Sequence, residues 1–168
     1  MNKWNTISLI GMPGAGKSTV GVILAKQTGL RFVDTDLDIQ LREKATLQEI
    51  LESQGYRRLR EIEHEVLMEI SLEHALVSTG GSVVYSEDAM DRLKEAGPVV
   101  YLEADLAILE QRVASAPPRG IASDSAQGYA GVYAERTPLY EHYADIRVNA
   151  CAGTADQVAF TILEQLSN

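Results

Sequence analysis

The sequence predicts an α/β protein in which a central parallel sheet of five strands is flanked by helices. Short apolar runs rich in β-branched residues alternate with longer segments of helical periodicity along the chain. The apolar runs are too hydrophobic to face water, which is typical of parallel strands covered by helices on both faces. A length of 168 residues suits a single domain over residues 1–168, and no linker of domain scale interrupts the pattern.

The predicted elements follow one another with clear boundary signals. Strands are predicted at residues 7–10, 30–33, 75–78, 99–102 and 146–148. Helices are predicted at residues 16–27, 37–72, 86–96, 105–113, 129–143 and 154–166, with breaks near Ala45 and Gly55 in the second of them. Ser86 is the expected N-cap of its helix, and Gly97 follows the end of that helix.

Residues 114–128 interrupt the alternation. They are rich in Ala, Ser, Gly and Pro and show neither a helical nor a strand period. Loops of this length are usually lids or disordered segments. Because Arg112 and Arg119 lie beside and within this stretch, we expect it to be a mobile lid.

Composition and charge restrict the partners. The net charge of −9 and the pI near 4.8 argue against a nucleic-acid partner, which would call for a basic face. No apolar run approaches the roughly 20 residues that span a bilayer, and residues 1–10 lack the basic start and cleavage site of a signal peptide. Cys151 is the only cysteine, which excludes an internal disulfide. We therefore expect a cytoplasmic monomer that binds neither nucleic acid nor membrane.

The strongest motif lies between the first strand and the first helix. Residues 11–19 read GMPGAGKST and match the pattern G-x-x-x-x-G-K-[ST] in full. Such a loop directs backbone N–H groups at nucleotide phosphates, its lysine bridges the β- and γ-phosphates, and its serine hydroxyl ligates Mg²⁺. The predicted nucleotide-binding residues are Gly14, Ala15, Gly16, Lys17, Ser18 and Thr19, and the alternative is a simple glycine-rich turn.

A phosphate loop alone does not separate GTPases, ATP-driven motors and metabolite kinases. The chain is short for a motor, and it contains no N-K-x-D motif that would read guanine. A small kinase needs, in addition, an acidic residue near the metal, an acceptor pocket and a cationic lid. The residues that could meet these three requirements lie after residue 19.

Four further motifs follow in order. They are Asp34-Thr35-Asp36, the pair Arg60 and Glu63, Ser78-Thr79-Gly80-Gly81-Ser82, and Arg136-Thr137-Pro138-Leu139-Tyr140. Together with the phosphate loop they resemble the shikimate kinases, whose corresponding patterns are D-[ST]-D, F-R-x-x-E, T-G-G-G and R-x-P-x-Y. The resemblance covers nearly the whole chain. It implies a P-loop kinase fold, with an acceptor-binding helical region at approximately residues 36–70.

The resemblance implies a role for each acidic and basic position. Asp34 would join Ser18 in the Mg²⁺ shell, and Asp36 would contact the acceptor hydroxyls. Physically, Asp36 is the candidate to orient the attacking hydroxyl or to accept its proton. The alternative for both aspartates is to cap the helix that begins near Leu37.

By the same resemblance, Arg60 and Arg136 would grip the acceptor carboxylate, which suits the planar fork of arginine. Gly80, Gly81 and Ser82 would meet the acceptor at the end of the third strand. For Arg60 the alternative is a surface ion pair with Glu63.

Arg112 and Arg119 are seven residues apart, as in the family, where the first stacks on adenine and the second lies on the lid. Arg119 would then stabilise charge on the transferring phosphoryl group, which makes Lys17, Asp36 and Arg119 the predicted catalytic residues. Each arginine could instead be a solvated side chain of a helix or loop.

The sequence departs from the family pattern on the acceptor side. Tyr56 follows Gly55 in place of glutamate, Leu59 replaces an aromatic residue, Ser82 replaces the third glycine, and Gly120 and Ile121 follow the lid arginine in place of Pro-Leu. The predicted function is ATP- and Mg²⁺-dependent phosphorylation of shikimate, giving shikimate 3-phosphate and ADP. The alternatives are a kinase of another small hydroxy acid, such as gluconate, and a catalytically degenerate relative that binds nucleotide.

Overall fold

The computed structural model describes residues 3–124 and 126–168; Met1, Asn2 and Ser125 (the last within the expected lid) lie outside the described residues. The elements in chain order are β1 (Thr6–Ile10), α1 (Lys17–Thr28), β2 (Arg31–Asp34), α2 (Thr35–Glu43), α3 (Leu47–Glu69), β3 (Ala75–Ser78), the 3₁₀ helix η1 (Val83–Tyr85), α4 (Glu87–Ala96), β4 (Val99–Glu103), α5 (Leu106–Ala114), α6 (Gly128–Tyr143), β5 (Ile146–Asn149) and α7 (Ala155–Ser167). Within the part of the chain that the structure describes, no helix is both long and apolar enough to cross a membrane.

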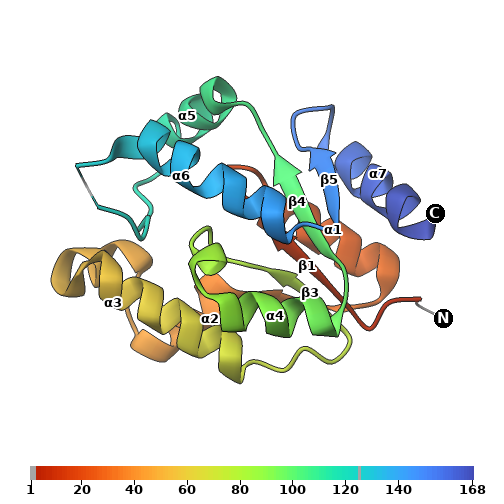
Figure 1. The fold of residues 1–168 in the computed structure, drawn as a ribbon, viewed down its shortest axis with the longest axis horizontal. Helices are drawn as coiled ribbons and strands as arrows, with labels where there is room; N and C mark the ends of the chain where they lie inside the picture. Colours follow the sequence, from red (N-terminus) through yellow and green to blue (C-terminus); the bar gives the residue numbers. More distant parts are fainter. Residues whose placement is uncertain (1–2, 125) are drawn as a thin grey trace.

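The described strands form one parallel sheet of five in the order β2-β3-β1-β4-β5, which confirms the predicted fold class (Figure 1). The central strand β1 pairs with β3, in register Thr6↔Ala75, and with β4, in register Ser8↔Val99. Every residue of β1 and β3 is buried. A strand covered on both faces has no polar side, so these segments read as continuous apolar runs.

Helices cover both faces of the sheet. α1 packs against α7 on one face, and α4 and α6 lie on the other (Figure 1). The chain crosses from β1 to β2 through α1 and in the opposite direction from β3 to β4 through α4. Right-handed crossovers then require α1 and α4 to lie on opposite faces. The carboxyl ends of β1 and β3 therefore flank the point where the connections diverge, which is where ligands of such sheets bind.

The predicted elements agree with the observed ones to within one or two residues at most ends. The Ser86 side chain accepts a hydrogen bond from the N–H of Ala89 and so caps α4, as predicted. The predicted long helix is divided into α2 and α3, and Gly55, with a φ of 84°, bends α3. The short helix η1 was not predicted.

The segment between α5 and α6, residues 115–127, is called the lid segment below, and its described residues form neither helix nor strand. Ala122 of this segment is buried in an apolar cluster that is separate from the main core. The other buried members come from α2 and α3 and are Ile39, Ile50, Leu59, Ile62 and Val66. In this structure the lid segment therefore lies against the helical region of residues 36–70.

Candidate active site

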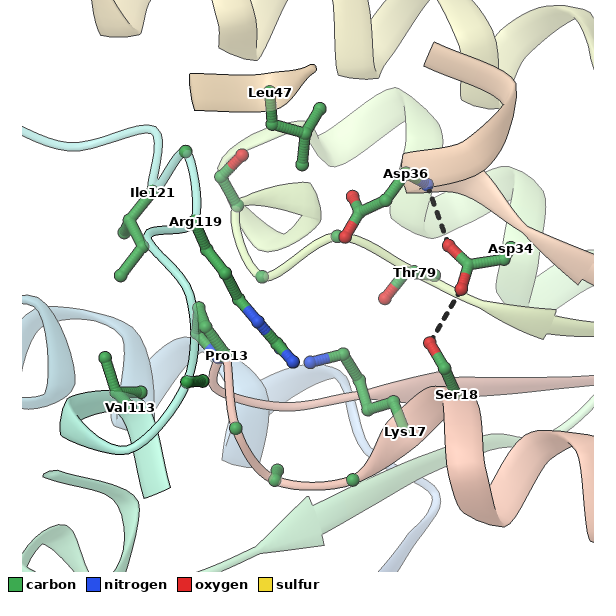
Figure 2. A pocket seen from close by; sticks show the side chains of 18 of the residues that line it. Pro13, Lys17, Ser18, Asp34, Asp36, Leu47, Thr79, Val113, Arg119 and Ile121 are labelled. Carbon is green, nitrogen blue, oxygen red and sulfur yellow. Dashed lines mark hydrogen bonds between the residues drawn. The ribbon is translucent and has the colours of Figure 1, made fainter. Parts of the chain in front are cut away.

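A cavity of about 720 Å³ opens at the carboxyl ends of β1, β2 and β3, where the connections diverge. The loop after β1 and the lid segment face the start of α2 across it (Figure 2). The predicted site residues that line it are Gly14, Ala15, Gly16, Lys17, Ser18, Thr19, Asp34, Asp36, Gly80, Gly81, Ser82, Arg112, Arg119 and Arg136. Of the predicted site residues, only Arg60 does not line this cavity.

The loop between β1 and α1 has the backbone of an anion site. Gly14 and Gly16 each have a φ of 92°, a left-handed conformation that a side chain would strain. Gly16 caps α1 with no side-chain hydrogen bond, so the first N–H groups of the helix remain for a ligand. The helix dipole adds partial positive charge at the same point.

Lys17 is buried at the start of α1. Its Nζ donates hydrogen bonds to the carbonyl oxygens of Gly11 at 2.7 Å and Met12 at 3.0 Å. Burial lowers the pKa of Lys17 to about 8, while the negative charge of Asp36 opposes that shift. The side chains of Lys17 and Arg119 point toward one another (Figure 2). Two cations that converge on open space create a position suited to an anion.

Ser18 and Asp34 could hold a divalent cation together. The Ser18 hydroxyl donates to Oδ2 of Asp34 at 2.7 Å, and Oδ1 of Asp34 accepts from the N–H groups of Asp36 and Leu37. Asp34 is thus the N-cap of α2, as the alternative interpretation held, and it also faces Ser18. A hydroxyl and a carboxylate are oxygen ligands of the kind that Mg²⁺ prefers, and Mg²⁺ completes its shell with water and phosphate oxygens. The residues present therefore fit a nucleotide-bound Mg²⁺.

Asp36 carries a carboxyl group into the cavity from the first turn of α2. Burial and the neighbouring Asp34 raise its pKa, and the positive charges of Lys17 and Arg119 act in the opposite direction. A carboxylate with a raised pKa is a better proton acceptor than an ordinary surface aspartate. Asp36 lies across the cavity from Lys17, on the side away from the phosphate loop (Figure 2).

The turn after β3 approaches the site side chains closely. A Cβ atom on Gly80 would overlap Oε1 of Glu63 and lie 3.0 Å from Oδ1 of Asp36. A Cβ atom on Gly81 would lie 2.7 Å from Nη1 of Arg136. Because both residues of the turn are glycines, the carboxyl groups of Glu63 and Asp36 and the guanidinium of Arg136 can all approach its backbone.

Arg136 is buried, with 1% of its surface exposed, yet it lines the cavity. Its Nη2 donates to the carbonyl of Ala122 at 3.1 Å, and its Nε is buried with no hydrogen-bond partner. Among the described residues it forms no ion pair with a carboxylate within 4.0 Å. A buried guanidinium without a counter-ion is a strong candidate for binding an anionic ligand.

Arg60 lies beside this cavity and not in its lining. Its Nε donates to the same Ala122 carbonyl at 2.8 Å, and its guanidinium lies 3.9 Å from the centre of the Tyr85 ring. Tyr56 does not line the cavity either; the centre of its ring lies 5.1 Å from the Arg60 guanidinium. The alternative interpretation of Arg60, a surface ion pair with Glu63, is wrong, because Glu63 is buried and bonded to Ser82.

The elements that border the lid segment are bonded to the phosphate loop. Nη1 of Arg112 in α5 donates to the carbonyl of Gly14 at 3.1 Å. The hydroxyl of Tyr129 in α6 donates to the carbonyl of Pro13 at 2.6 Å. Within the lid segment, a Cβ atom on Gly120 would overlap the backbone of Leu47, so only glycine allows this approach to α3.

Three features of the site were not predicted. They are the Ser82–Glu63 hydrogen bond, the Tyr85 ring beside both arginines, and the Tyr129 bond to the phosphate loop. Each joins residues that are distant in sequence. Glu63 belongs to a family motif and Ser82 departs from one, whereas Tyr85 and Tyr129 carry no sequence signal. Tyr85 lies on the unpredicted helix η1, and nothing in its neighbourhood marks it as a binding residue.

Phosphoryl transfer to a hydroxyl group is the chemistry that this arrangement serves, and the class of protein is that of the P-loop kinases. The shikimate kinase family model matches residues 13–167. The chain belongs to the shikimate kinase family.

Individual relatives agree with this assignment. Shikimate kinase 2 of Yersinia pestis (strain Pestoides F) is 34% identical over 166 residues, which cover 96% of this chain and 92% of that protein. The structure of shikimate kinase from Acinetobacter baumannii in complex with shikimate matches with a TM-score of 0.86 at 30% identity, covering 99% of this chain and 94% of that one. The structure of shikimate kinase from Aquifex aeolicus vf5 matches with a TM-score of 0.82 at 29% identity, covering 96% of each chain.

Proposed function

We propose that this protein is an ATP- and Mg²⁺-dependent shikimate kinase, which converts shikimate and ATP to shikimate 3-phosphate and ADP. The observation that carries the choice of acceptor is Arg136, a buried guanidinium that lines the cavity and lacks a carboxylate partner among the described residues. An acceptor that bears a carboxylate would supply the missing charge. Shikimate, which is bound in the related Acinetobacter baumannii structure, is an acceptor of this kind.

At the phosphate end, the free N–H groups that follow Gly16 would bind the β- and γ-phosphates of ATP. Lys17 would exchange its two backbone carbonyl partners for phosphate oxygens, and Arg119 would contact the transferring group from the lid segment. Ser18 and Asp34 would hold Mg²⁺, which when bound neutralises charge on the phosphates. Arg112 and Thr19 would complete the nucleotide end.

At the acceptor end, Asp36 would orient the attacking hydroxyl and accept its proton, since its carboxyl is the one that faces Lys17 across the cavity. Gly80, Gly81 and Ser82 would form the floor beneath the acceptor, with Arg136 beside them. The charged groups thus divide the cavity into a phosphate end and a carboxylate end.

Four departures from the family pattern line the cavity, namely Leu59, Ser82, Gly120 and Ile121, so they are where a different hydroxy acid could be selected. Tyr56 does not line it. A catalytically degenerate relative would have no need of the converging Lys17, Asp36 and Arg119. Their common orientation into one cavity supports an active kinase.

The test couples ADP release to a panel of acceptors consisting of shikimate, quinate, gluconate and homoserine. We expect turnover of shikimate above the others, loss of turnover when EDTA removes Mg²⁺, and recovery when Mg²⁺ is restored. Arg147→Ala serves as the matched control, because Arg147 is a surface arginine paired with Glu141 away from the cavity. Efficient turnover of a neutral alcohol, independent of Arg136, would contradict the proposal.

A further inference from the structure

Ser82 stands where the family pattern has a third glycine, and it is buried with Glu63 in the lining of the cavity, at the proposed acceptor end. The Ser82 hydroxyl donates a hydrogen bond to Oε2 of Glu63. The other oxygen, Oε1, is buried without a partner. Ser82 is therefore the only hydrogen-bonding partner of the Glu63 side chain among the described residues.

Arg136 is a buried cation next to this pair. Oε1 of Glu63 lies next to Gly80, and Nη1 of Arg136 lies next to the adjacent Gly81. The two side chains therefore contact successive residues of one turn. Buried opposite charges that contact successive residues of one turn would normally pair, because an unpaired charge in the interior is costly. They do not pair here: Glu63 is bonded to Ser82, and Arg136 donates to the Ala122 carbonyl.

We propose that Ser82 is a positioning residue of the acceptor site, whose hydroxyl holds the Glu63 carboxylate away from Arg136 and so keeps that guanidinium available to an anionic acceptor. Without the hydroxyl, the cations that act on Glu63 are Arg136 and, more weakly, Lys17, so Arg136 becomes its main partner. The internal carboxylate then competes with the acceptor carboxylate for the same guanidinium. This inference rests on the proposed function and assigns to Ser82 a role in acceptor affinity.

The charges around Glu63 are consistent with this competition. Burial and the negative charge of Asp36 on α2 raise the pKa of Glu63 to about 7, whereas Ser82, Arg136 and Lys17 act to lower it. Tyr140 of α6 also faces this carboxyl group. Near neutral pH a substantial fraction of Glu63 is ionised, and the ionised form is the one that competes for Arg136.

The kinetic test removes the hydroxyl and then the competing charge. Ser82→Ala should raise the KM for shikimate roughly 10-fold, with kcat and the KM for ATP within about 2-fold of wild type. Adding Glu63→Gln to Ser82→Ala should restore the KM to within about 3-fold, because a neutral amide does not compete with a carboxylate for Arg136. Ser167→Ala, at the exposed end of α7, is the matched control. Failure of Glu63→Gln to rescue Ser82→Ala would mean that Ser82 acts only through packing.

A second measurement does not depend on activity. The pKa of Glu63 can be followed through its carboxyl carbon by NMR in the ligand-free protein, in wild type, Ser82→Ala and Ser82→Gly. Loss of a hydroxyl donor alone raises the pKa, whereas a new ion pair with Arg136 lowers it by roughly 1 to 3 units. We expect the pKa to fall in whichever variant folds.

The two measurements separate the possible failures. An increase in the pKa of Glu63 in Ser82→Ala or Ser82→Gly, or an unchanged acceptor KM, overturns the role of Ser82 and leaves the proposed function intact. If wild type phosphorylates no anionic acceptor, the proposed function fails, and the direction of the pKa change still decides whether Ser82 separates Glu63 from Arg136.

Discussion

Arg60 and Arg136 donate hydrogen bonds to the same backbone carbonyl, that of Ala122, at 2.8 and 3.1 Å. Both guanidinium groups also lie beside the Tyr85 ring, at 3.9 and 5.4 Å from its centre. Two cations directed at one oxygen are the arrangement that a carboxylate would satisfy better than a carbonyl, because charge-assisted hydrogen bonds are the stronger ones. If these arginines bind the acceptor carboxylate as proposed, they would exchange the Ala122 carbonyl of the lid segment for that carboxylate.

The two arginines should contribute unequally to acceptor binding. Arg136 is buried and lines the cavity, whereas Arg60 is partly exposed beside it. Arg136→Ala should weaken acceptor binding by about 2 kcal/mol or more, roughly 30-fold in KM. Arg60→Ala should cost about 1 kcal/mol, roughly 5-fold, as expected for one hydrogen bond at a partly exposed site. Steady-state kinetics with Arg147→Ala as control would measure both, and a larger effect of Arg60 would contradict this ranking.

The lid segment should respond to both substrates. The lid segment carries exposed Arg119 and packs on the rest of the protein through Gly120, Ile121 and Ala122. We expect the amides of residues 114–128 to exchange fastest in the free protein and to become protected with a non-hydrolysable ATP analogue and shikimate bound. Hydrogen exchange followed by mass spectrometry measures this directly. Unchanged exchange in the ternary complex would show that the segment is not a lid.

Lys17→Ala should abolish activity without unfolding the protein. Among the described residues, the ammonium of Lys17 donates hydrogen bonds only to carbonyls of its own loop, so its removal breaks no hydrogen bond between elements. We expect kcat to fall at least about 100-fold, as for loss of one preorganised charge at a transition state. The change in Tm should stay within about 3 °C, which corresponds to roughly 1 kcal/mol for a protein of this size. Lys26→Ala, at the exposed end of the same helix, is the control.

Stability should depend on pH through Glu63. Its folded-state pKa, about 7, lies above the ordinary glutamate value of 4.5, so the folded protein binds more protons than the unfolded chain between these values. The contribution is fully present below pH 4.5 and is lost as the pH rises through about 7. Wild type should therefore lose up to about 3 kcal/mol of this contribution to the free energy of unfolding between pH 5 and pH 8, and Glu63→Gln, which does not titrate, should lose none of it.

Urea titrations at the two pH values would test this, with the exposed Glu52→Gln as control. An equal difference between Glu63→Gln and wild type at both pH values would mean that Glu63 titrates normally.

The sequence was sufficient for the sheet and for the phosphate end of the site. The buried strands are short apolar runs, and the loop of residues 11–19 is contiguous, so local pattern determines both. The bend at Gly55 and the cap at Ser86 were predicted for the same reason, because each depends on one residue and its immediate neighbours.

The acceptor end depends on contacts between distant elements, which a single sequence does not encode locally. Arg60 on α3 matched the family motif, yet its side chain lies against Tyr85 and Ala122 and outside the cavity lining. The burial of Glu63, and hence its raised pKa, arises only when α3 packs on the turn after β3. Ser82 could be noted as unusual, but its partner became visible only in three dimensions.

Arg112 and Tyr129 flank the lid segment and bond to the carbonyls of Gly14 and Pro13, two consecutive residues of the phosphate loop. The lid segment is thus tethered at both ends to the same short piece of chain. The two ends of the lid segment are therefore already held close together, and the entropy cost of joining them has been met. Ordering the lid over bound ligands then costs only the conformational entropy of the residues between the two ends. A nucleotide that shifts Pro13 or Gly14 would move the tethers, whereas an acceptor bound by Arg136 as proposed would act through Ala122 in the middle of the segment. The two substrates therefore act on one loop at different points, and each should lower the ordering cost that the other still has to meet.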